Sequence, residues 1–250
     1  MTDLPGPAAG AGTSPDLHRV TAVELRGVTA AYGSIDVLRD VDLRVETGTV
    51  VALLGPNGGG KSTTLRVIAG QLVPKAGELW LAGRRVTGAA PQEIARRGVC
   101  LVPEGRGVFP NLTVRENLWM STHTGTPRAV VEQITYERFP QLGDRRSQLA
   151  GSLSGGEQQM LSLARALATD PALVLLDELS MGLAPRVVER LYEIVAELAR
   201  TGVSILVVEQ FARAVLGIAD RAGIMLNGRI TAFGDPGEIE SELSTAYLGG

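Results

Sequence analysis

The chain alternates between continuous apolar runs and segments with helical periodicity. Apolar runs at residues 50–54, 99–102, 172–176 and 203–208 each predict a strand that is buried on both faces. Between the last two runs, apolar residues recur at helical spacing after Pro185, a residue type that suits the first turn of a helix. The alternation of strand and helix favours an α/β fold with a largely parallel sheet.

Shorter alternating runs flank this pattern. Residues 21–45 alternate apolar and polar positions, which predicts antiparallel strands, and residues 78–81 continue that sheet. Residues 224–230 predict a hairpin around an Asn-Gly turn. We therefore expect a mixed core sheet with an N-terminal antiparallel β lobe. Residues 1–20 are rich in Pro, Gly and Ala, and we expect a disordered tail that lacks the features of a signal peptide.

The middle of the chain is more polar than the rest, and its pattern predicts helices. Thr113 and Glu116 stand at the spacing of a capping box. We interpret residues 105–164, to within a few positions, as a helical lobe inserted into one domain that spans residues 21–250. The pair Arg145-Arg146 in this lobe is more typical of a solvated face than of a binding patch.

A glycine-rich loop joins the strand at residues 50–54 to the next helix. It has the spacing Gly, four residues, Gly, Lys and Ser/Thr in a strand-to-helix context. Glycines let successive backbone N–H groups turn toward one concavity, and the helix adds its positive N-terminal end. Lys61 is placed to reach the β- and γ-phosphates of a nucleotide, and Ser62 to ligate Mg²⁺. The sequence predicts that a nucleoside triphosphate is bound by Gly55, Pro56, Asn57, Gly58, Gly59, Gly60, Lys61, Ser62 and Thr63.

Two carboxylates follow the apolar run at residues 172–176. Asp177 and Glu178 would lie beside the phosphate loop, because the carboxyl ends of parallel strands meet at one edge of a sheet. Asp177 is predicted to hold Mg²⁺ directly or through water, and Glu178 to act as the base that orients an attacking water.

Two further features allow more than one interpretation. Ser154 and Glu157 stand at capping-box spacing around Gly155 and Gly156. The pattern alone favours an ordinary capped helix over an anion site. Tyr32 could stack on an adenine ring, although a surface or edge-strand tyrosine fits the pattern equally well.

The composition of the chain limits the partners, the redox compartment and the membrane topology that we expect. The 24 Lys and Arg against 27 Asp and Glu leave a net charge of −3, so charge alone does not favour a polyanion, and we expect no nucleic-acid partner. Cys100 is the one cysteine, which excludes an intrachain disulfide and is typical of a reducing compartment. The apolar runs fall far short of the roughly 18 residues of a spanning helix, so we do not expect the chain to cross a bilayer itself.

The chain after the tail resembles the ATP-binding subunits of ABC transporters. The motifs that carry the resemblance stand in the family's order, at residues 55–63, 153–159 and 173–178. The resemblance identifies the segment after Leu153 as the family signature rather than an ordinary cap. It implies a head-to-tail dimer in which the Ser154–Glu157 helix end of one copy closes over ATP and Mg²⁺ held by the other copy's phosphate loop. It also implies that Tyr32 stacks on the adenine and that residues 180–183 touch the partner copy.

Several positions depart from the family pattern. Glu104 stands where most members carry the glutamine that contacts Mg²⁺ and the attacking water, and Gln210 replaces the switch histidine that contacts the γ-phosphate. A carboxylate can ligate Mg²⁺ and an amide can donate to phosphate, so we predict catalytic roles for both residues and a place for Glu104 among the Mg²⁺ ligands. Leu179 replaces the usual proline after Glu178, and Gly59 replaces the usual alanine, which we interpret as a small change.

Residues 102–106, 208–210 and 246–250 look like the branched-chain amino-acid transport ATPases of the family. That resemblance implies import, driven from the cytoplasmic face of a bacterial inner membrane by a peripheral subunit. The implied partners are a second ATPase subunit, transmembrane permeases and, indirectly, a periplasmic solute-binding protein. The helical lobe and the loop after Glu104 would dock the permease.

Two alternatives stay open, and the sequence argues against a third. The same kind of ATPase subunit could drive the transport of another small solute, such as urea or a short amide. The protein could instead be a nucleotide-gated regulatory module that hydrolyses poorly because of Glu104 and Gln210. A soluble nucleic-acid or translation ATPase of this superfamily would be expected to carry two ATPase domains in one chain, and this sequence contains one.

Overall fold

The computed structural model describes residues 20–105, 107–121, 125–210 and 213–248. The expected disordered tail therefore lies outside the described residues except for Val20, and Arg106 lies outside them as well.

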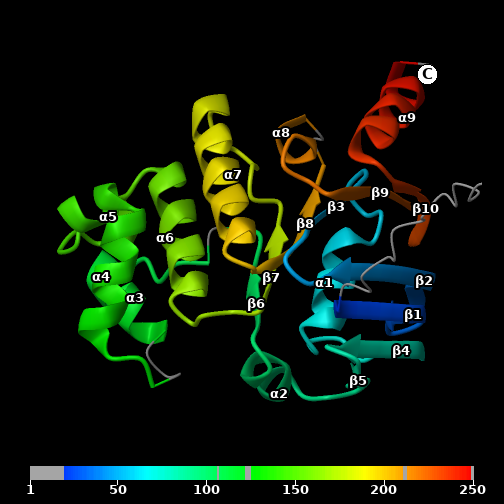
Figure 1. The fold of residues 1–250 in the computed structure, drawn as a ribbon, viewed down its shortest axis with the longest axis horizontal. Helices are drawn as coiled ribbons and strands as arrows, with labels where there is room; N and C mark the ends of the chain where they lie inside the picture. The colour runs from blue at the N-terminus through cyan, green and yellow to red at the C-terminus, as the bar shows by residue number, and fades with distance from the viewer. Residues whose placement is uncertain (1–19, 106, 122–124, 211–212, 249–250) are drawn as a thin grey trace, which may run out of the picture.

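In the described part of the chain, six strands form the central sheet, in the order β10-β9-β3-β8-β7-β6 (Figure 1). The strands from β9 to β6 run parallel, and β10 pairs antiparallel with β9. The prediction of a mixed core sheet is therefore confirmed. The strands are β3 (Val50–Leu54), β6 (Val99–Val102), β7 (Leu173–Asp177), β8 (Ser204–Glu209), β9 (Arg221–Leu226) and β10 (Arg229–Gly234).

A second, antiparallel sheet forms the predicted β lobe, on the right of Figure 1. Its order is β2-β1-β4-β5, and β1 pairs with both β2 and β4. The strands are β1 (Thr21–Tyr32), β2 (Ile35–Glu46), β4 (Ala76–Leu81) and β5 (Arg84–Arg85). Leu25 and Leu43 of this lobe share one buried cluster with Leu65 of α1 (Lys61–Ile68) and Leu53 of β3. Helix α1 is thus packed between the two sheets, which fixes the phosphate loop at its start.

Helices α3 to α6 gather on the opposite side of the molecule (Figure 1). The predicted capping box is present at the start of α3, where Thr113 and Glu116 bond each other's backbone N–H groups. The helices are α2 (Pro91–Arg96), α3 (Val114–Trp119), α4 (Arg128–Arg138), α5 (Pro140–Asp144), α6 (Gly155–Leu167), α7 (Pro185–Arg200), α8 (Arg213–Leu216) and α9 (Pro236–Leu248), with a 3-10 turn, η2, at Ala150–Ser152.

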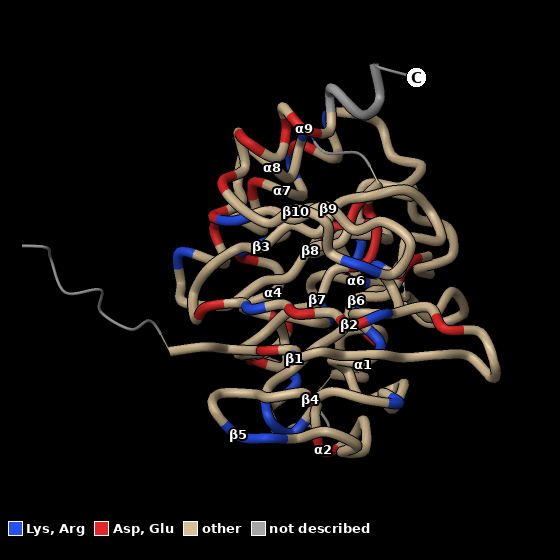
Figure 2. Tube along the Cα trace, turned by 90° about the vertical axis from the view of Figure 1, so that its right-hand side faces the viewer, with Lys and Arg blue, Asp and Glu red and all other residues tan. Residues whose placement is uncertain are grey.

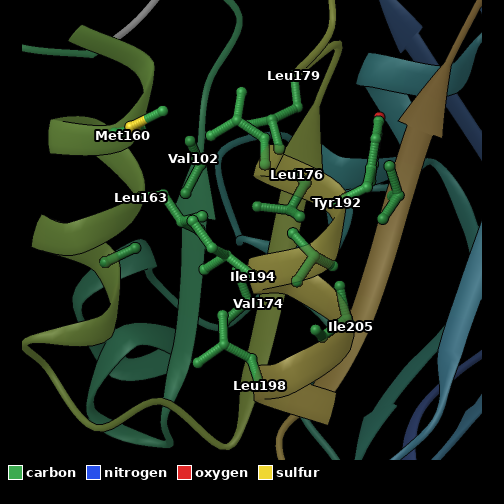
Figure 3. Packing of buried hydrophobic residues seen from close by; sticks show 14 of the residues in the cluster. Val102, Met160, Leu163, Val174, Leu176, Leu179, Tyr192, Ile194, Leu198 and Ile205 are labelled. Atoms are coloured by element: carbon green, nitrogen blue, oxygen red, sulfur yellow. The ribbon is translucent and has the colours of Figure 1, made fainter. Parts of the chain in front are cut away.

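The central sheet is covered on both faces, which explains its continuous apolar runs. Along β7, Val174 and Leu176 pack into the cluster with α6 and α7, whereas Leu173 and Leu175 belong to the cluster with α1 and the β lobe. Figure 3 shows the first of these clusters, to which the apolar stripe of α7 contributes Ile194 and other residues. Every residue of β7 is buried. A strand in this position has no polar face, so its sequence cannot alternate.

Charged residues of both signs are spread over the molecule (Figure 2). Acidic residues are frequent around α8 and α9, and β5 at the other end carries Arg84 and Arg85. The small net charge of the sequence therefore reflects charges of both signs on the same molecule.

Candidate functional site

The phosphate loop connects β3 to α1 and needs its glycines for two physical reasons. A Cβ on Gly55 would lie 2.1 Å from the carbonyl oxygen of Met225 in β9, so a side chain does not fit there. Gly58 and Gly60 have φ values of 79° and 108°, which L side chains rarely adopt. The Gly228 N–H donates to the Gly59 carbonyl over 2.8 Å, so the turn between β9 and β10 supports the loop from below.

Gly59 has less room than the sequence interpretation assumed. A Cβ at this position would lie 2.9 Å from the Met225 oxygen and 3.0 Å from the Pro56 oxygen. The replacement of the family's alanine by glycine is therefore more than a small change in this chain, because the loop and β9 approach each other here.

The loop borders a cavity of about 210 Å³. The lining residues are Val37, Asn57, Gly58, Gly60, Lys61, Ser62, Thr63, Glu104 and Glu178. The structure thus brings Glu104 and Glu178 to the phosphate loop from two different strand ends. Val37 of β2 was not predicted as a site residue, because an apolar residue in a strand carries no local signal of such a role.

Lys61 is buried, with its ammonium inside the loop. Its Nζ donates to the carbonyl oxygens of Gly55 and Pro56 over 3.0 and 3.1 Å. The same Nζ lies 3.4 Å from Oε1 of Glu178. Glu178 thereby balances a buried cation that would otherwise be costly to bury, and a phosphate could take over this role.

Asp177 and Ser62 form a direct pair at the edge of the cavity. Ser62 Oγ donates to Asp177 Oδ1 over 2.8 Å. Burial raises the pKa of Asp177, the hydrogen bond from Ser62 opposes this, and the charges of Glu178 and Glu104 raise it further. A hydroxyl and a carboxylate oxygen side by side are hard donors of the kind that Mg²⁺ prefers. Among the described residues, no group of three or more His, Cys, Asp or Glu side chains is arranged to hold a metal ion. Phosphate and water oxygens would therefore have to complete the coordination of Mg²⁺.

Glu178 has a strained backbone. Its φ is 46°, in the left-handed region that a non-glycine residue adopts only when its surroundings impose it. Its N–H donates to the Val208 carbonyl of β8 over 3.0 Å. The turn after β7 therefore directs the Glu178 side chain toward Lys61 rather than along the strand direction.

Tyr32 lies at the end of β1 and is 42% exposed. Its hydroxyl oxygen accepts a hydrogen bond from Arg66 Nη1 of α1 over 2.9 Å, and this bond is the main cause of the raised pKa of Arg66. The ring does not line the phosphate cavity. Sequence reasoning missed Arg66, because its contact with Tyr32 joins residues far apart in the chain.

Ser154 and Glu157 form a capping box at the start of α6. The Ser154 N–H donates to Glu157 Oε2 over 2.8 Å, and Arg145 Nε lies 2.7 Å from Glu157 Oε1. Burial alone would raise the pKa of Glu157, but the hydrogen bonds from Ser154 and the charge of Arg145 together lower it. The prediction that Arg145 belongs to a solvated face is confirmed, since its side chain is 43% exposed. Its ion pair with Glu157, which the sequence did not predict, links this exposed face to the signature.

The signature does not line the phosphate cavity of its own chain. Gln158 and Gln159 of α6 instead border a second cavity of about 480 Å³, together with Glu178 and Met181. A Cβ on Gly156 would lie 2.5 Å from Val187 at the start of α7, so this glycine permits close packing of α6 against α7. Gln210 follows β8 and is partly buried, and it does not line either cavity.

Comparison with known proteins identifies the family. Residues 38–180 match the ABC transporter family. The chain is 41% identical to the high-affinity branched-chain amino acid transport ATP-binding protein BraG of Pseudomonas aeruginosa, over 89% of this chain and 97% of that protein. It is 34% identical to the probable branched-chain amino acid transport ATP-binding protein LivF of Archaeoglobus fulgidus, over 85% and 91%. It is also 36% identical to the lipopolysaccharide export ATP-binding protein LptB of Acidithiobacillus ferridurans, over 91% and 96%.

Solved structures agree. The ADP conformation of MJ1267, an ATP-binding cassette of an ABC transporter, matches with a TM-score of 0.81 and 25% identity over 92% of this chain and 99% of that one. The chain therefore belongs to the ABC transporter family. It is an ATP-binding subunit that hydrolyses ATP. None of the helices in the described residues is long and apolar enough to cross a membrane.

Proposed function

We propose that this subunit couples ATP hydrolysis to the import of branched-chain amino acids. The observation that carries the proposal is the 41% identity to BraG over nearly the whole of both chains. The solute itself does not touch an ATP-binding subunit, so kinship is the only trace of it in this sequence.

The geometry of the site supports a separate role for each site residue within residues 21–250. The loop amides and Lys61 would bind the phosphates, and Lys61 would exchange its bonds to the Gly55 and Pro56 carbonyls for bonds to phosphate oxygens. Ser62 and Asp177 would hold Mg²⁺, with Glu104 nearby as a further ligand. When bound, Mg²⁺ would offset the negative charge that develops on the phosphates. Glu178 would orient the attacking water and accept its proton.

A second ATPase copy or homologue is the proposed partner. Because Ser154 to Glu157 do not line the cavity of their own chain, they are available to a nucleotide held by another. Tyr32 would stack on the adenine, and Gln210 would donate to the γ-phosphate of the nucleotide in its own chain. Closure over the γ-phosphate would then depend on ATP, and hydrolysis would reopen the pair.

The proposed setting is the cytoplasmic face of a bacterial inner membrane. The inserted helical lobe, at about residues 105–164, would dock transmembrane permeases, and a periplasmic solute-binding protein would deliver the amino acid.

Lys61→Ala tests this function in cells of the source organism. Loss of the ammonium should abolish uptake of labelled leucine and leave uptake of labelled urea unchanged. Lys75→Ala is the matched control, because Lys75 is the other lysine of the sequence and forms an exposed ion pair with Asp36 at 2.8 Å. We expect wild-type uptake of both solutes in that variant.

The other outcomes identify the alternatives. If urea uptake falls and leucine uptake does not, the ATPase subunit drives the transport of a different solute. If neither falls in a strain without other leucine importers, the branched-chain assignment is wrong, and the lipopolysaccharide export relative makes a non-import role the next candidate.

A further inference from the structure

A buried carboxylate next to the site is not used by the chemistry above. Glu209 is the last residue of β8 and is 1% exposed. Its Oε1 accepts a hydrogen bond from the Ser180 N–H over 2.9 Å, and its Oε2 accepts one from Ser180 Oγ over 2.8 Å. The Tyr192 hydroxyl of α7, itself 3% exposed, also donates to Oε1. Figure 3 shows this hydroxyl pointing toward the carboxyl ends of β7 and β8.

These bonds hold the turn that follows Glu178. Glu178 is fixed through its N–H to the Val208 carbonyl, Leu179 is buried in the core, and Ser180 is bonded twice to Glu209. Two consecutive residues of β8 thus hold a segment whose first residue has a φ of 46°. A left-handed glutamate relaxes unless such contacts impose its conformation.

Stability alone gives little reason to place a carboxylate here. Burial raises the pKa of Glu209, and the hydrogen bonds from Tyr192 and Ser180 only partly oppose this shift. Desolvation of a carboxylate costs more free energy than a well-packed apolar residue of similar size would. What the carboxylate supplies is two acceptors in a fixed geometry for both polar groups of Ser180.

We propose that Glu209 is a positioning residue for ATP hydrolysis, which clamps Ser180 and thereby directs the Glu178 carboxylate into the phosphate cavity. The proposal rests on the role of Glu178 in the function proposed above. Glu209 does not line the phosphate cavity. It therefore acts through the backbone of residues 178–180, and its loss should lower the rate of the chemical step without weakening ATP binding.

The test compares three variants of the full chain, assayed for steady-state ATP turnover, for ATP affinity and for amide hydrogen exchange. Glu209→Ala removes the clamp, and we expect kcat to fall by roughly tenfold or more while the KM for ATP stays within about twofold. Glu209→Gln keeps one acceptor oxygen for the Ser180 N–H and offers an amide to the Ser180 hydroxyl. It should therefore retain the wild-type kcat within about threefold.

Ser204→Ala is the matched control at the other end of β8. Ser204 is buried, and its Oγ accepts the Gly48 N–H over 3.1 Å, far along the strand from Glu178. This variant loses a buried hydrogen bond in the same strand, and we expect an unchanged kcat. Hydrogen exchange at residues 178–183 should accelerate in Glu209→Ala and not in Ser204→Ala.

The outcomes separate the positioning role from the proposed function. A folded Glu209→Ala chain with wild-type kcat, or one whose ATP affinity falls as much as its kcat, would overturn the positioning role. If Glu209→Ala does not fold, Ser180→Ala decides, because it removes one clamp bond and should lower kcat alone, and an unchanged kcat would contradict the proposal. If the wild type has no turnover, or if Glu178→Gln keeps wild-type turnover, the proposed function fails instead. Hydrogen exchange still shows in that case whether Glu209 holds the turn.

Discussion

Helices α3 and α6 begin with the same local device, and the comparison shows what separates a structural cap from a candidate binding site. Thr113 Oγ1 lies 2.8 Å from Glu116 Oε2, and Ser154 Oγ lies 2.7 Å from Glu157 Oε2. Both boxes satisfy the same backbone groups at the helix start. The capping-box spacing alone does not tell the two apart.

The difference lies in the first two amides of each helix. In α3, the N–H groups of Val114 and Arg115 donate to the carbonyls of Gln148 and Arg146 over 2.9 and 3.0 Å. In α6, the corresponding amides belong to Gly155 and Gly156, and within the described residues neither has a hydrogen-bond acceptor. Of these two helices, only α6 therefore has amides available to an anion.

Placing a carboxylate at each cap gives the largest expected contrast. Asp caps a helix about as well as Ser, but each new carboxylate would lie beside the Glu carboxylate of its own capping box. Ser154→Asp and Thr113→Asp should therefore carry similar costs in stability, which makes them a matched pair. At Ser154, however, the new charge would face a phosphate. Two unit charges about 4 Å apart at an effective dielectric constant of about 20 interact by about 4 kcal/mol, enough to lower turnover by roughly a hundredfold or more. Thr113→Asp should leave turnover per folded molecule unchanged, and a loss there of similar size would remove the distinction.

Removing each cap gives an intermediate contrast. Thr113→Ala and Ser154→Ala should each lower the free energy of unfolding by about 1 kcal/mol, measured by chemical denaturation. Under the proposed function, only Ser154→Ala should also lower ATP turnover, by roughly tenfold, because it alone would lose a donor to phosphate. Equal turnover in the two folded variants would mean that Ser154 is a structural cap like Thr113.

The smallest effect is expected for Arg145→Ala. This side chain is 43% exposed, and its ion pair with Glu157 should contribute only about 0.2–1 kcal/mol to stability. Because the capping box remains, turnover should change by no more than about twofold, and the loss of stability should shrink at high salt. A large loss of turnover would show that Arg145 itself takes part in the site.

What the sequence could predict depended on how local the signal was. The phosphate loop, the strand ending in Asp177 and Glu178, and the Asn-Gly hairpin at residues 227–228 are encoded within a few positions, and the structure contains each of them. The buried strands of the mixed sheet were predicted from continuous apolar runs, because a strand that is covered on both faces carries apolar residues at successive positions.

The missed features all join distant parts of the chain. Arg66 bonds Tyr32, Arg145 pairs with Glu157, and Glu209 accepts from Ser180 and Tyr192. A single sequence does not show which strand ends and helix ends meet, so these partners could not be assigned from it. The tight fit at Gly59 was missed for the same reason, because Met225 limits the space there.

The claim that the signature acts on another chain's nucleotide is tested most directly by two measurements on the Ser154→Asp chain. The first is its affinity for ATP at a concentration at which the protein is monomeric. The second is its ATP turnover in the assembled state. In the proposed function, the signature acts on a nucleotide held by another chain, since it does not line the cavity of its own. We therefore expect a wild-type dissociation constant for ATP together with lost turnover. A dissociation constant weakened as much as the turnover would contradict the account, because the signature would then belong to the binding site of its own chain.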